Sequence, residues 1–146
     1  MATAQTTENF PCTNEQFFSI ASDYEKYPEF LSEVKQVKIL ETKGNRKLAE
    51  FQVSVVKTFS YRLWITEEKP NRISWTLESG DLFKTSVGSW DLSEVKGHTH
   101  AKYAVEATFK VFVPGPIAKA LVNVNLPNMM RAYHARVKTK FGSKHE

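Results

Sequence analysis

The last third of the chain carries its longest helical pattern of apolar residues. These residues recur at intervals of three and four, and they are Ile117, Leu121, Val124, Met129, Met130, Tyr133, Val137 and Phe141. Such spacing places them on one stripe of a helix, with Lys and Arg on the remaining surface. The pattern therefore predicts a long helix over residues 114–141, whose apolar face needs a partner surface from the rest of the chain.

Pro127 interrupts this pattern. A proline inside a helix removes one backbone donor and crowds the carbonyl four residues earlier, which here belongs to Asn123. We therefore expect a kink or a break at this position, and Asn125 could cap a second helix that begins there.

The N-terminal part predicts one strand followed by two short helices. Residues 2–10 are rich in Thr and favour a strand. Thr13 and Gln16 have the spacing of a capping box, which predicts a helix over residues 14–22. Pro28 then forbids a continuous helix through residues 23–31, so we expect a short second helix or turn there. Its inward residues would be Tyr24, Tyr27, Phe30 and Leu31.

From residue 33 onward the period of the pattern changes from that of a helix to two, which is the period of a strand. The alternating apolar residues are Val37, Ile39, Phe51, Val53, Val55, Phe59, Tyr61, Leu63, Ile65, Ile73, Trp75, Leu77, Tyr103, Val105, Ala107, Phe109 and Val111, and a longer strand runs from Phe83 to Val95. Turn residues separate the runs at 43–45, 69–71, 79–81 and 96–97. Gly88 marks a possible bulge in the longer strand. The pattern predicts six consecutive antiparallel strands and an α+β domain.

Composition limits the class of protein. The chain has 146 residues, a net charge of +4 and a single cysteine, Cys12, so it cannot form an internal disulfide. We expect a reducing compartment, and the N-terminal residues carry no basic and apolar export signal. No apolar run approaches the ~20 residues of a membrane helix. These features predict a cytoplasmic protein of one domain, residues 1–146, without a transmembrane segment.

Three short motifs, together with the order of the predicted elements, resemble one known superfamily. The motifs are Asp23, Tyr27, Pro28 and Phe30 in the pattern D-x-x-x-Y-P-x-F, the turn Pro70-Asn71-Arg72-Ile73, and the strand Gly88-Ser89-Trp90-Asp91-Leu92. The chain is similar to the START-like (helix-grip, SRPBCC-type) superfamily, and within it to the polyketide cyclase/dehydrase and coenzyme Q-binding group. The resemblance implies a curved antiparallel sheet of about seven strands around a long C-terminal helix, with two short helices after the first strand.

The resemblance also implies an apolar cavity between the concave sheet face and the long helix. The candidate ligand-binding residues are Tyr61, Trp64, Trp75, Trp90, Tyr103, Phe109, Met129, Met130 and Tyr133. The alternative is that these side chains simply pack the core. A register slip of one residue would also reverse which face of a strand lines the cavity.

Catalytic and metal-binding residues are not indicated. His98 and His100 share one strand face, but no third ligand stands at a suitable spacing, so we expect them to be exposed. His134 could act as a general base, or lie at the boundary of the core. Cys12 has no partner for nucleophilic chemistry, and no phosphate loop is present. The sequence predicts no cofactor and no metal.

The C-terminal residues are basic. Arg131, Arg136, Lys138, Lys140 and Lys144 would form either a solvated helix face or a surface for an anionic partner such as RNA or a lipid headgroup.

Three hypotheses of function follow, in order of preference. The first is non-catalytic binding of a small hydrophobic ligand, such as a lipid or an isoprenoid quinone, in the cavity. The second is a polyketide aromatase/cyclase, which would need a buried polar group such as Tyr61, Tyr103 or His134. The third is a regulator like the ribosome-association toxin-like relatives, which would use the basic helix face to contact the ribosome or RNA. No DNA partner is expected.

Overall fold

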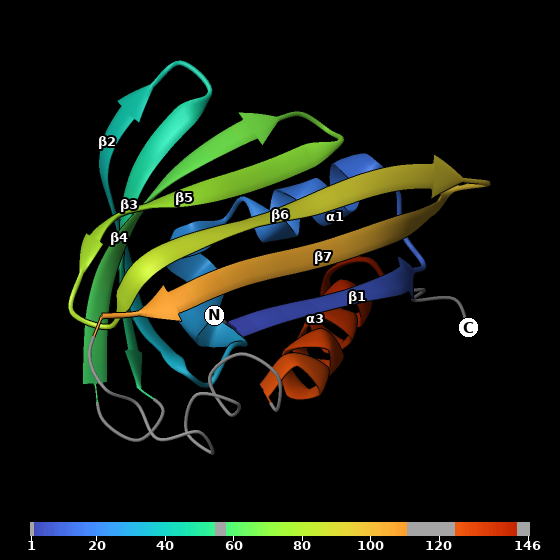
Figure 1. Ribbon diagram of the computed structural model, residues 1–146. Coiled ribbons are helices and arrows are strands. Elements are labelled where there is room, and N and C mark those ends of the chain that lie inside the picture. The colour runs from blue at the N-terminus through green and yellow to red at the C-terminus, as the bar shows by residue number, and fades with distance from the viewer. Residues whose placement is uncertain (1, 55–57, 111–124, 143–146) are drawn as a thin grey trace.

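A computed structural model describes residues 2–54, 58–110 and 125–142 of the chain (Figure 1). In chain order the elements are β1 (Ala2–Phe10), α1 (Asn14–Ala21), the 3-10 helix η1 (Tyr24–Glu29), β2 (Val34–Lys43), β3 (Arg46–Ser54), β4 (Thr58–Glu68), β5 (Arg72–Gly80), β6 (Phe83–Val95), β7 (His98–Phe109) and α3 (Asn125–Phe141). This order confirms the prediction of one strand, two short helices, six strands and a C-terminal helix. Val55 and Val111, which the pattern placed on strands, lie outside the described residues.

The strands form one antiparallel sheet in the order β1-β7-β6-β5-β4-β3-β2. Strands β2 to β7 are a meander, and β1 pairs with β7 at the edge through residues 2–10. The sheet curves strongly, and α1, η1 and α3 lie on its concave side (Figure 1). This arrangement confirms the predicted α+β helix-grip fold.

The capping box that the sequence predicted is present at the start of α1. The backbone N–H of Gln16 donates to the Thr13 hydroxyl at 3.1 Å, and the backbone N–H of Thr13 donates to the Gln16 side chain at 2.9 Å. The helix ends at Ala21, one residue before the predicted end. Its short length leaves room for η1, where Tyr24 is buried and where Tyr27 and Phe30 pack against the core, as predicted.

The bulge predicted at Gly88 is wrong. Gly88 pairs regularly with Trp75 on β5 and with Val105 on β7, and the irregularity in β6 lies instead between Phe83 and Thr85. Glycine is required here for a different reason. A Cβ on Gly88 would lie 2.2 Å from Cζ2 of Trp75, so the indole ring of Trp75 occupies the space that a side chain would take.

The helix α3 begins at Asn125, so Pro127 lies in its first turn. Its missing N–H breaks no helical bond there, because the first four N–H groups of a helix have no partner within it. The start of α3 at Asn125 agrees with the predicted second helix, and the predicted kink or break involves residues outside the described part of the chain. The predicted helical residues 114–124 and the side chain of Asn125 lie outside the described part of the chain. The apolar stripe is confirmed, since Met130, Tyr133 and Val137 are buried.

One cluster of almost completely buried side chains, which we call the packed end, consists of Phe10, Phe17, Trp90 and Val137. The rings of Phe10 and Phe17 stack with their centroids 4.5 Å apart, and Phe17 meets Trp90 edge-on at 5.0 Å. These residues come from β1, α1 and β6, and Val137 of α3 completes the cluster. Burial of each such side chain is favourable by about 1.5–3 kcal/mol, and the packed end therefore fixes the helices against the sheet.

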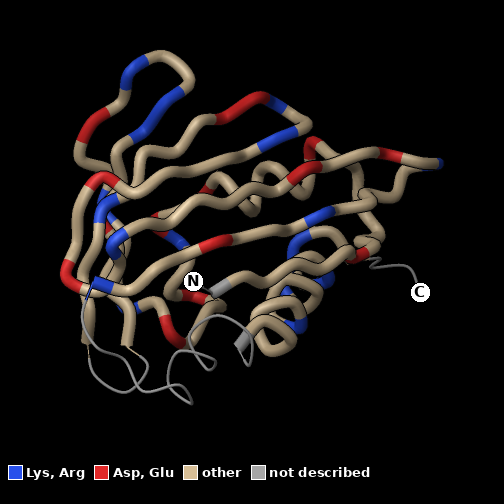
Figure 2. The backbone as a smooth tube through the Cα atoms, viewed as in Figure 1, with Lys and Arg blue, Asp and Glu red and all other residues tan. Residues whose placement is uncertain are grey.

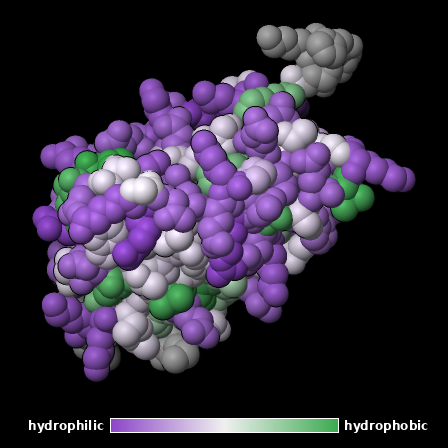
Figure 3. All heavy atoms as spheres, turned by 90° about the horizontal axis from the view of Figure 1, so that it is seen from above, coloured by the Kyte–Doolittle hydropathy of each residue, from purple (hydrophilic) through white to green (hydrophobic). Residues whose placement is uncertain are grey.

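The surface is polar by contrast. The face seen from above in Figure 1 is largely hydrophilic, and its hydrophobic side chains form separate small patches (Figure 3). The large hydrophobic side chains exposed among the described residues are Leu40, Val87 and Val95.

Candidate functional site

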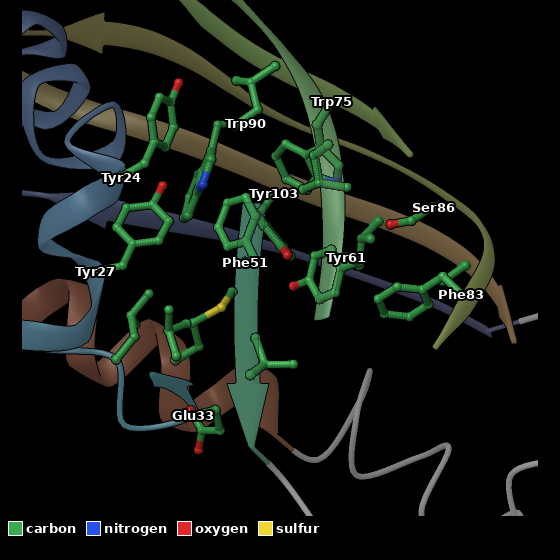
Figure 4. A pocket seen from close by; sticks show the side chains of 18 of the residues that line it. Tyr24, Tyr27, Glu33, Phe51, Tyr61, Trp75, Phe83, Ser86, Trp90 and Tyr103 are labelled. Carbon is green, nitrogen blue, oxygen red and sulfur yellow. The ribbon is translucent and has the colours of Figure 1, made fainter. Parts of the chain in front are cut away.

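A cavity of about 230 Å³ lies beside the packed end, between the sheet, η1 and the first turns of α3 (Figure 4). Each strand from β2 to β7 contributes to its wall. The lining residues are Tyr24, Tyr27, Leu31, Glu33, Val34, Phe51, Val53, Tyr61, Leu63, Ile65, Ile73, Trp75, Leu82, Phe83, Ser86, Trp90, Tyr103, Val105, Ala107, Leu126, Met129 and Tyr133. The wall is therefore mainly apolar and aromatic, as is usual for sites that bind small molecules.

The curvature of the sheet explains why this space exists. The closest neighbours of α3 are α1 and β1, and strands β3 to β5 curve away from these elements (Figure 1). Their inward side chains, such as Leu63 and Ile65 of β4, are buried without reaching the helix closely enough to fill the gap.

Six of the nine residues predicted for ligand binding line this cavity. They are Tyr61, Trp75, Trp90, Tyr103, Met129 and Tyr133. Phe109 lies next to the cavity without lining it, with its ring stacked on that of Phe83 at 5.6 Å. Met130 is buried in the core and does not border the cavity.

Trp64 corrects the prediction, because it lies on the opposite, convex face of the sheet. Its neighbours Leu63 and Ile65 point inward, and successive residues of a strand point to opposite faces. The indole N–H of Trp64 donates to Glu78 at 3.0 Å, and the guanidinium of Arg46 lies 4.7 Å from the ring centroid. Its aromatic character suggested the cavity, but the parity of the strand places it outside.

Several lining residues were not among the predicted ligand-binding residues. Phe51 pairs with Tyr61 across β3 and β4, and their rings stack at 5.5 Å, so strand pairing would have identified it. Tyr24 and Tyr27 were expected to point inward, and the motif around Pro28 was the available signal. Glu33 and Leu82 lie outside the strands, where no periodic pattern could have identified them.

The tyrosine hydroxyls of the cavity fall into two groups. Tyr24 donates to a carboxylate oxygen of Glu67 at 2.7 Å, and Tyr27 donates to the backbone carbonyl of Ala21. Tyr61 and Tyr103 instead direct their hydroxyls into the cavity (Figure 4) and form no hydrogen bond with any described residue. The hydroxyls of Tyr24 and Tyr27 are therefore hydrogen-bonded within the protein, whereas those of Tyr61 and Tyr103 are available to a ligand.

Burial sets the protonation state of these hydroxyls. Loss of solvent around Tyr61 and Tyr103 raises the pKa of both phenols well above the usual value of 10.0. Burial also raises the pKa of Tyr133 to about 12, although the nearby Tyr27 hydroxyl and the Trp90 indole N–H oppose the rise. All three groups therefore remain protonated at neutral pH and act as hydrogen-bond donors.

Charge is sparse around the cavity. Among the described lining residues Glu33 is the single acidic side chain, and none is Lys, Arg or His. Glu33 is half-buried and lies at the edge of the cavity, away from Tyr61 and Tyr103 (Figure 4). The described part of the chain contains no group of three His, Cys, Asp or Glu side chains that could hold a metal ion.

The histidines and Cys12 lie outside this site. His98 and His100 are exposed, as predicted. The imidazole of His134 lies 2.9 Å from a carboxylate oxygen of Glu8 and stacks near Phe10 at 4.3 Å, so it is a boundary residue rather than part of the cavity wall. Burial raises the pKa of the Cys12 thiol to about 11, which keeps it protonated and weakly nucleophilic.

The basic face of α3 is divided. Lys and Arg recur along the helix (Figure 2). Arg131, Lys138 and Lys140 are exposed, whereas the guanidinium of Arg136 lies 2.8 Å from Glu29 and 5.0 Å from the ring centroid of Phe30. Arg136 lowers the pKa of Glu29 through this contact. Lys144 lies outside the described residues. No helix in the described ranges is long and apolar enough to cross a membrane.

A curved antiparallel sheet that wraps a C-terminal helix and encloses an apolar cavity defines the helix-grip class of proteins. Residues 11–133 match the model of the family described as polyketide cyclase/dehydrase and lipid transport, and the chain belongs to that family. This match confirms the resemblance that the three sequence motifs indicated.

Solved structures support the same fold. A START superfamily protein from Mycobacterium smegmatis superposes with a TM-score of 0.84 at 22% identity, over 94% of this chain and 98% of that one. The Zhui aromatase/cyclase from a Streptomyces species gives 0.83 at 12% identity, over 95% and 94%. A STAR-related lipid transfer protein from Xanthomonas axonopodis gives 0.76 at 11% identity, over 93% and 85%. Such low identities establish the fold alone.

No curated protein sequence matches this chain significantly. The family and the similar structures also give no support for the predicted contact with the ribosome or RNA through α3.

Proposed function

We propose that this protein binds a small hydrophobic molecule, such as a lipid or an isoprenoid quinone-like compound, in the cavity without catalysing a reaction. The observation that carries the proposal is the unfilled space of about 230 Å³ behind an aromatic wall in an otherwise packed core. A concave space with a mainly apolar and aromatic wall is the usual form of a small-molecule site, so this space favours an occupant.

The volume limits what the cavity can hold. An apolar cavity of about 150 Å³ is large enough to bind benzene. The larger space here accommodates a ligand with one or two rings, and any long tail would extend beyond the cavity. Each Å² of apolar ligand surface that leaves water contributes about 25 cal/mol, which is how such a wall generates affinity.

The proteins of similar fold are consistent with this proposal. One is described as a STAR-related lipid transfer protein and another as an aromatase/cyclase, and a lipid is a largely apolar ligand. The fold therefore supports a hydrophobic ligand, while the side chains of this chain decide which one.

A polyketide aromatase/cyclase is the second candidate, and the free hydroxyls of Tyr61 and Tyr103 favour it. Two neutral donors directed into a water-poor cavity can orient a carbonyl and stabilise the negative charge that develops on its oxygen. On this hypothesis a linear polyketone probe would be cyclised, and Tyr61→Phe and Tyr103→Phe would abolish turnover. Absence of cyclised product with the unmodified protein would leave the binding function as the better explanation.

Native mass spectrometry of the gently purified protein, followed by solvent extraction, tests the binding function. We expect a bound hydrophobic species. A matched pair of variants locates it. Ser86 lines the cavity and is 5% exposed, so Ser86→Phe should fill the space and abolish the bound mass. Ser74 lies on the convex face, so Ser74→Phe should retain it.

Two results would contradict the proposal. One is a bound species that Ser86→Phe retains as fully as Ser74→Phe does, because the ligand would then lie elsewhere. The other is a protein that carries nothing and binds no hydrophobic probe when one is added.

A further inference from the structure

We infer that the cavity selects electrically neutral ligands that carry an oxygen acceptor, and that Tyr61 and Tyr103 bind this oxygen between their hydroxyls. The inference rests on the proposed function and specifies the polar chemistry of its ligand. Suitable oxygens are those of ketones, quinones, esters or alcohols, whereas free carboxylates are excluded.

The two donors come from distant parts of the sheet. Tyr61 is on β4 and Tyr103 is on β7, and strands β5 and β6 separate them. The curvature of the sheet turns both hydroxyls toward one another inside the cavity (Figure 4). The phenols are close enough to interact electrostatically, yet they form no hydrogen bond with each other or with another described residue. One acceptor atom of a ligand, placed in the gap between the two hydroxyls, would accept a hydrogen bond from each of them.

Neighbouring rings hold both phenols in position. Phe51 stacks on Tyr61 with an interplanar angle of 10°, and Trp90 packs against Tyr103 at 4.9 Å. Trp75 contacts Tyr103 from another side at 5.8 Å. Because the rings are fixed by packing, little side-chain freedom is lost when a ligand binds, and the donors are organised in advance.

The donors are also accessible to an acceptor. Both hydroxyls reach the open space of the cavity, because no buried side-chain N or O atom of the described residues lacks a hydrogen-bond partner, and a carbonyl oxygen can accept one hydrogen bond on each of its two lone pairs. Burial keeps both phenols protonated and uncharged, so neither can form an ion pair with a ligand. One neutral ligand oxygen therefore satisfies both tyrosines.

Charge explains the exclusion of carboxylates. An ionised carboxylate in an apolar environment requires a paired cation, because its desolvation outweighs what neutral donors return. The described cavity wall provides no Lys, Arg or His. Glu33, at the edge of the cavity, adds repulsion to any anion inside it.

Three naphthalene probes of similar shape test the inference on the full chain at neutral pH. They are acetylnaphthalene, which carries the ketone oxygen, isopropenylnaphthalene, in which a methylene replaces that oxygen, and naphthoate, which is anionic. Calorimetric titration should show that Tyr61→Phe and Tyr103→Phe each weaken the ketone about 3- to 10-fold, as expected for one lost hydrogen bond. Both variants should bind the hydrocarbon within about twofold of the unmodified protein. This unchanged binding also shows that the variants are folded.

Two further variants separate the causes. Tyr24 lines the same cavity, but its hydroxyl is bound to Glu67, so Tyr24→Phe should affect the ketone and the hydrocarbon equally. Naphthoate should bind at least about 100-fold more weakly than the ketone, and Glu33→Gln should reduce this difference several-fold.

Each outcome decides one proposal. If both Tyr→Phe variants bind the ketone as tightly as the unmodified protein, or if naphthoate binds as tightly as the ketone, the inference is overturned while the binding function stands. If none of the three probes binds to the unmodified protein, or if Ser86→Phe binds them equally well, the proposed cavity function itself fails.

Discussion

The concave face of the sheet has two ends that use the same kinds of residues and reach opposite results. At the packed end, Phe10, Phe17, Trp90 and Val137 fill the space between β1, β6, α1 and α3. At the cavity end, which we define by Phe51, Tyr61, Trp75, Phe83 and Tyr103, the rings stand along the wall of an unfilled space. Aromatic residues by themselves therefore do not distinguish a core from a binding site.

The polar groups differ between the two ends in an instructive way. At the packed end the Thr99 hydroxyl lies 2.9 Å from the carbonyl oxygen of Cys12 and 3.0 Å from the side-chain oxygen of Asn14. Asn14 in turn donates to Asn71 at 3.3 Å. At the cavity end, Tyr61 and Tyr103 have no such partner among the described residues. At the packed end the polar side chains therefore pair with one another, whereas at the cavity end the hydroxyls of Tyr61 and Tyr103 are left available to a ligand.

Alkaline pH should have the largest effect. Burial raises the pKa of all five tyrosines, which are Tyr24, Tyr27, Tyr61, Tyr103 and Tyr133. In the unfolded chain each ionises near 10, so above that pH the unfolded state binds fewer protons than the folded state. The free energy of unfolding should therefore fall as pH rises above 10, by up to about 1.4 kcal/mol per pH unit for each tyrosine.

Phenolate absorbance, followed together with urea unfolding, measures this effect. The absorbance should rise only as the protein unfolds, at a pH above 10. The opposite result is that two tyrosines ionise near pH 10 in the folded protein and that their absorbance signal disappears in the Tyr61→Phe and Tyr103→Phe variants. That result would show that water fills the cavity end. The cavity end would then be a solvated groove and not a dry cavity with free donors.

Truncation of one aromatic ring at each end should separate the two regions by stability. Phe17 is completely buried at the packed end, so Phe17→Ala should lower the free energy of unfolding by about 3–5 kcal/mol. Phe83 already borders the empty cavity and is half-buried, so Phe83→Ala should lower it by only about 1–2 kcal/mol. Urea unfolding of both variants is the measurement. Equal losses would mean that the cavity end is packed as tightly as the other.

A smaller effect than that of Phe17→Ala is expected at the contact between Gly88 and Trp75. A methyl group at Gly88 would collide with the Trp75 ring, so Gly88→Ala should force the indole toward the cavity and destabilise the fold by about 1–3 kcal/mol. Adding Trp75→Leu should recover part of this loss, because the smaller side chain removes the collision. A double-mutant cycle measures the coupling, and strictly additive losses would show that Trp75 does not depend on Gly88 for its place in the wall.

Local patterns of the sequence were enough to predict the elements and their order. The alternation of apolar residues identified the strands, and the capping box of Thr13 and Gln16 identified the start of α1. These features depend on residues that are close in the chain. The motif around Pro28 pointed to the family for the same reason, and residues 11–133 confirmed it.

Local patterns failed where contacts between distant residues decide the outcome. Trp64 is a different case, because its local alternation with Leu63 and Ile65 already indicated the outer face, and its aromatic character was given more weight. Gly88 was interpreted as a bulge because a glycine in a strand has two common causes, and the close approach of an indole from β5 was the one that applied.

The sequence by itself therefore determined the α+β class, the order of the strands and helices, and most of the residues that face inward, because periodicity reports burial directly. Only the tertiary structure decided that one end of the concave face is filled while the other is hollow. It also decided that Tyr61 and Tyr103, which are distant in the chain, direct unpaired hydroxyls toward one another. The physical reason is that curvature of a sheet is a property of all its strands together, and no single strand encodes where the gap beneath it will lie.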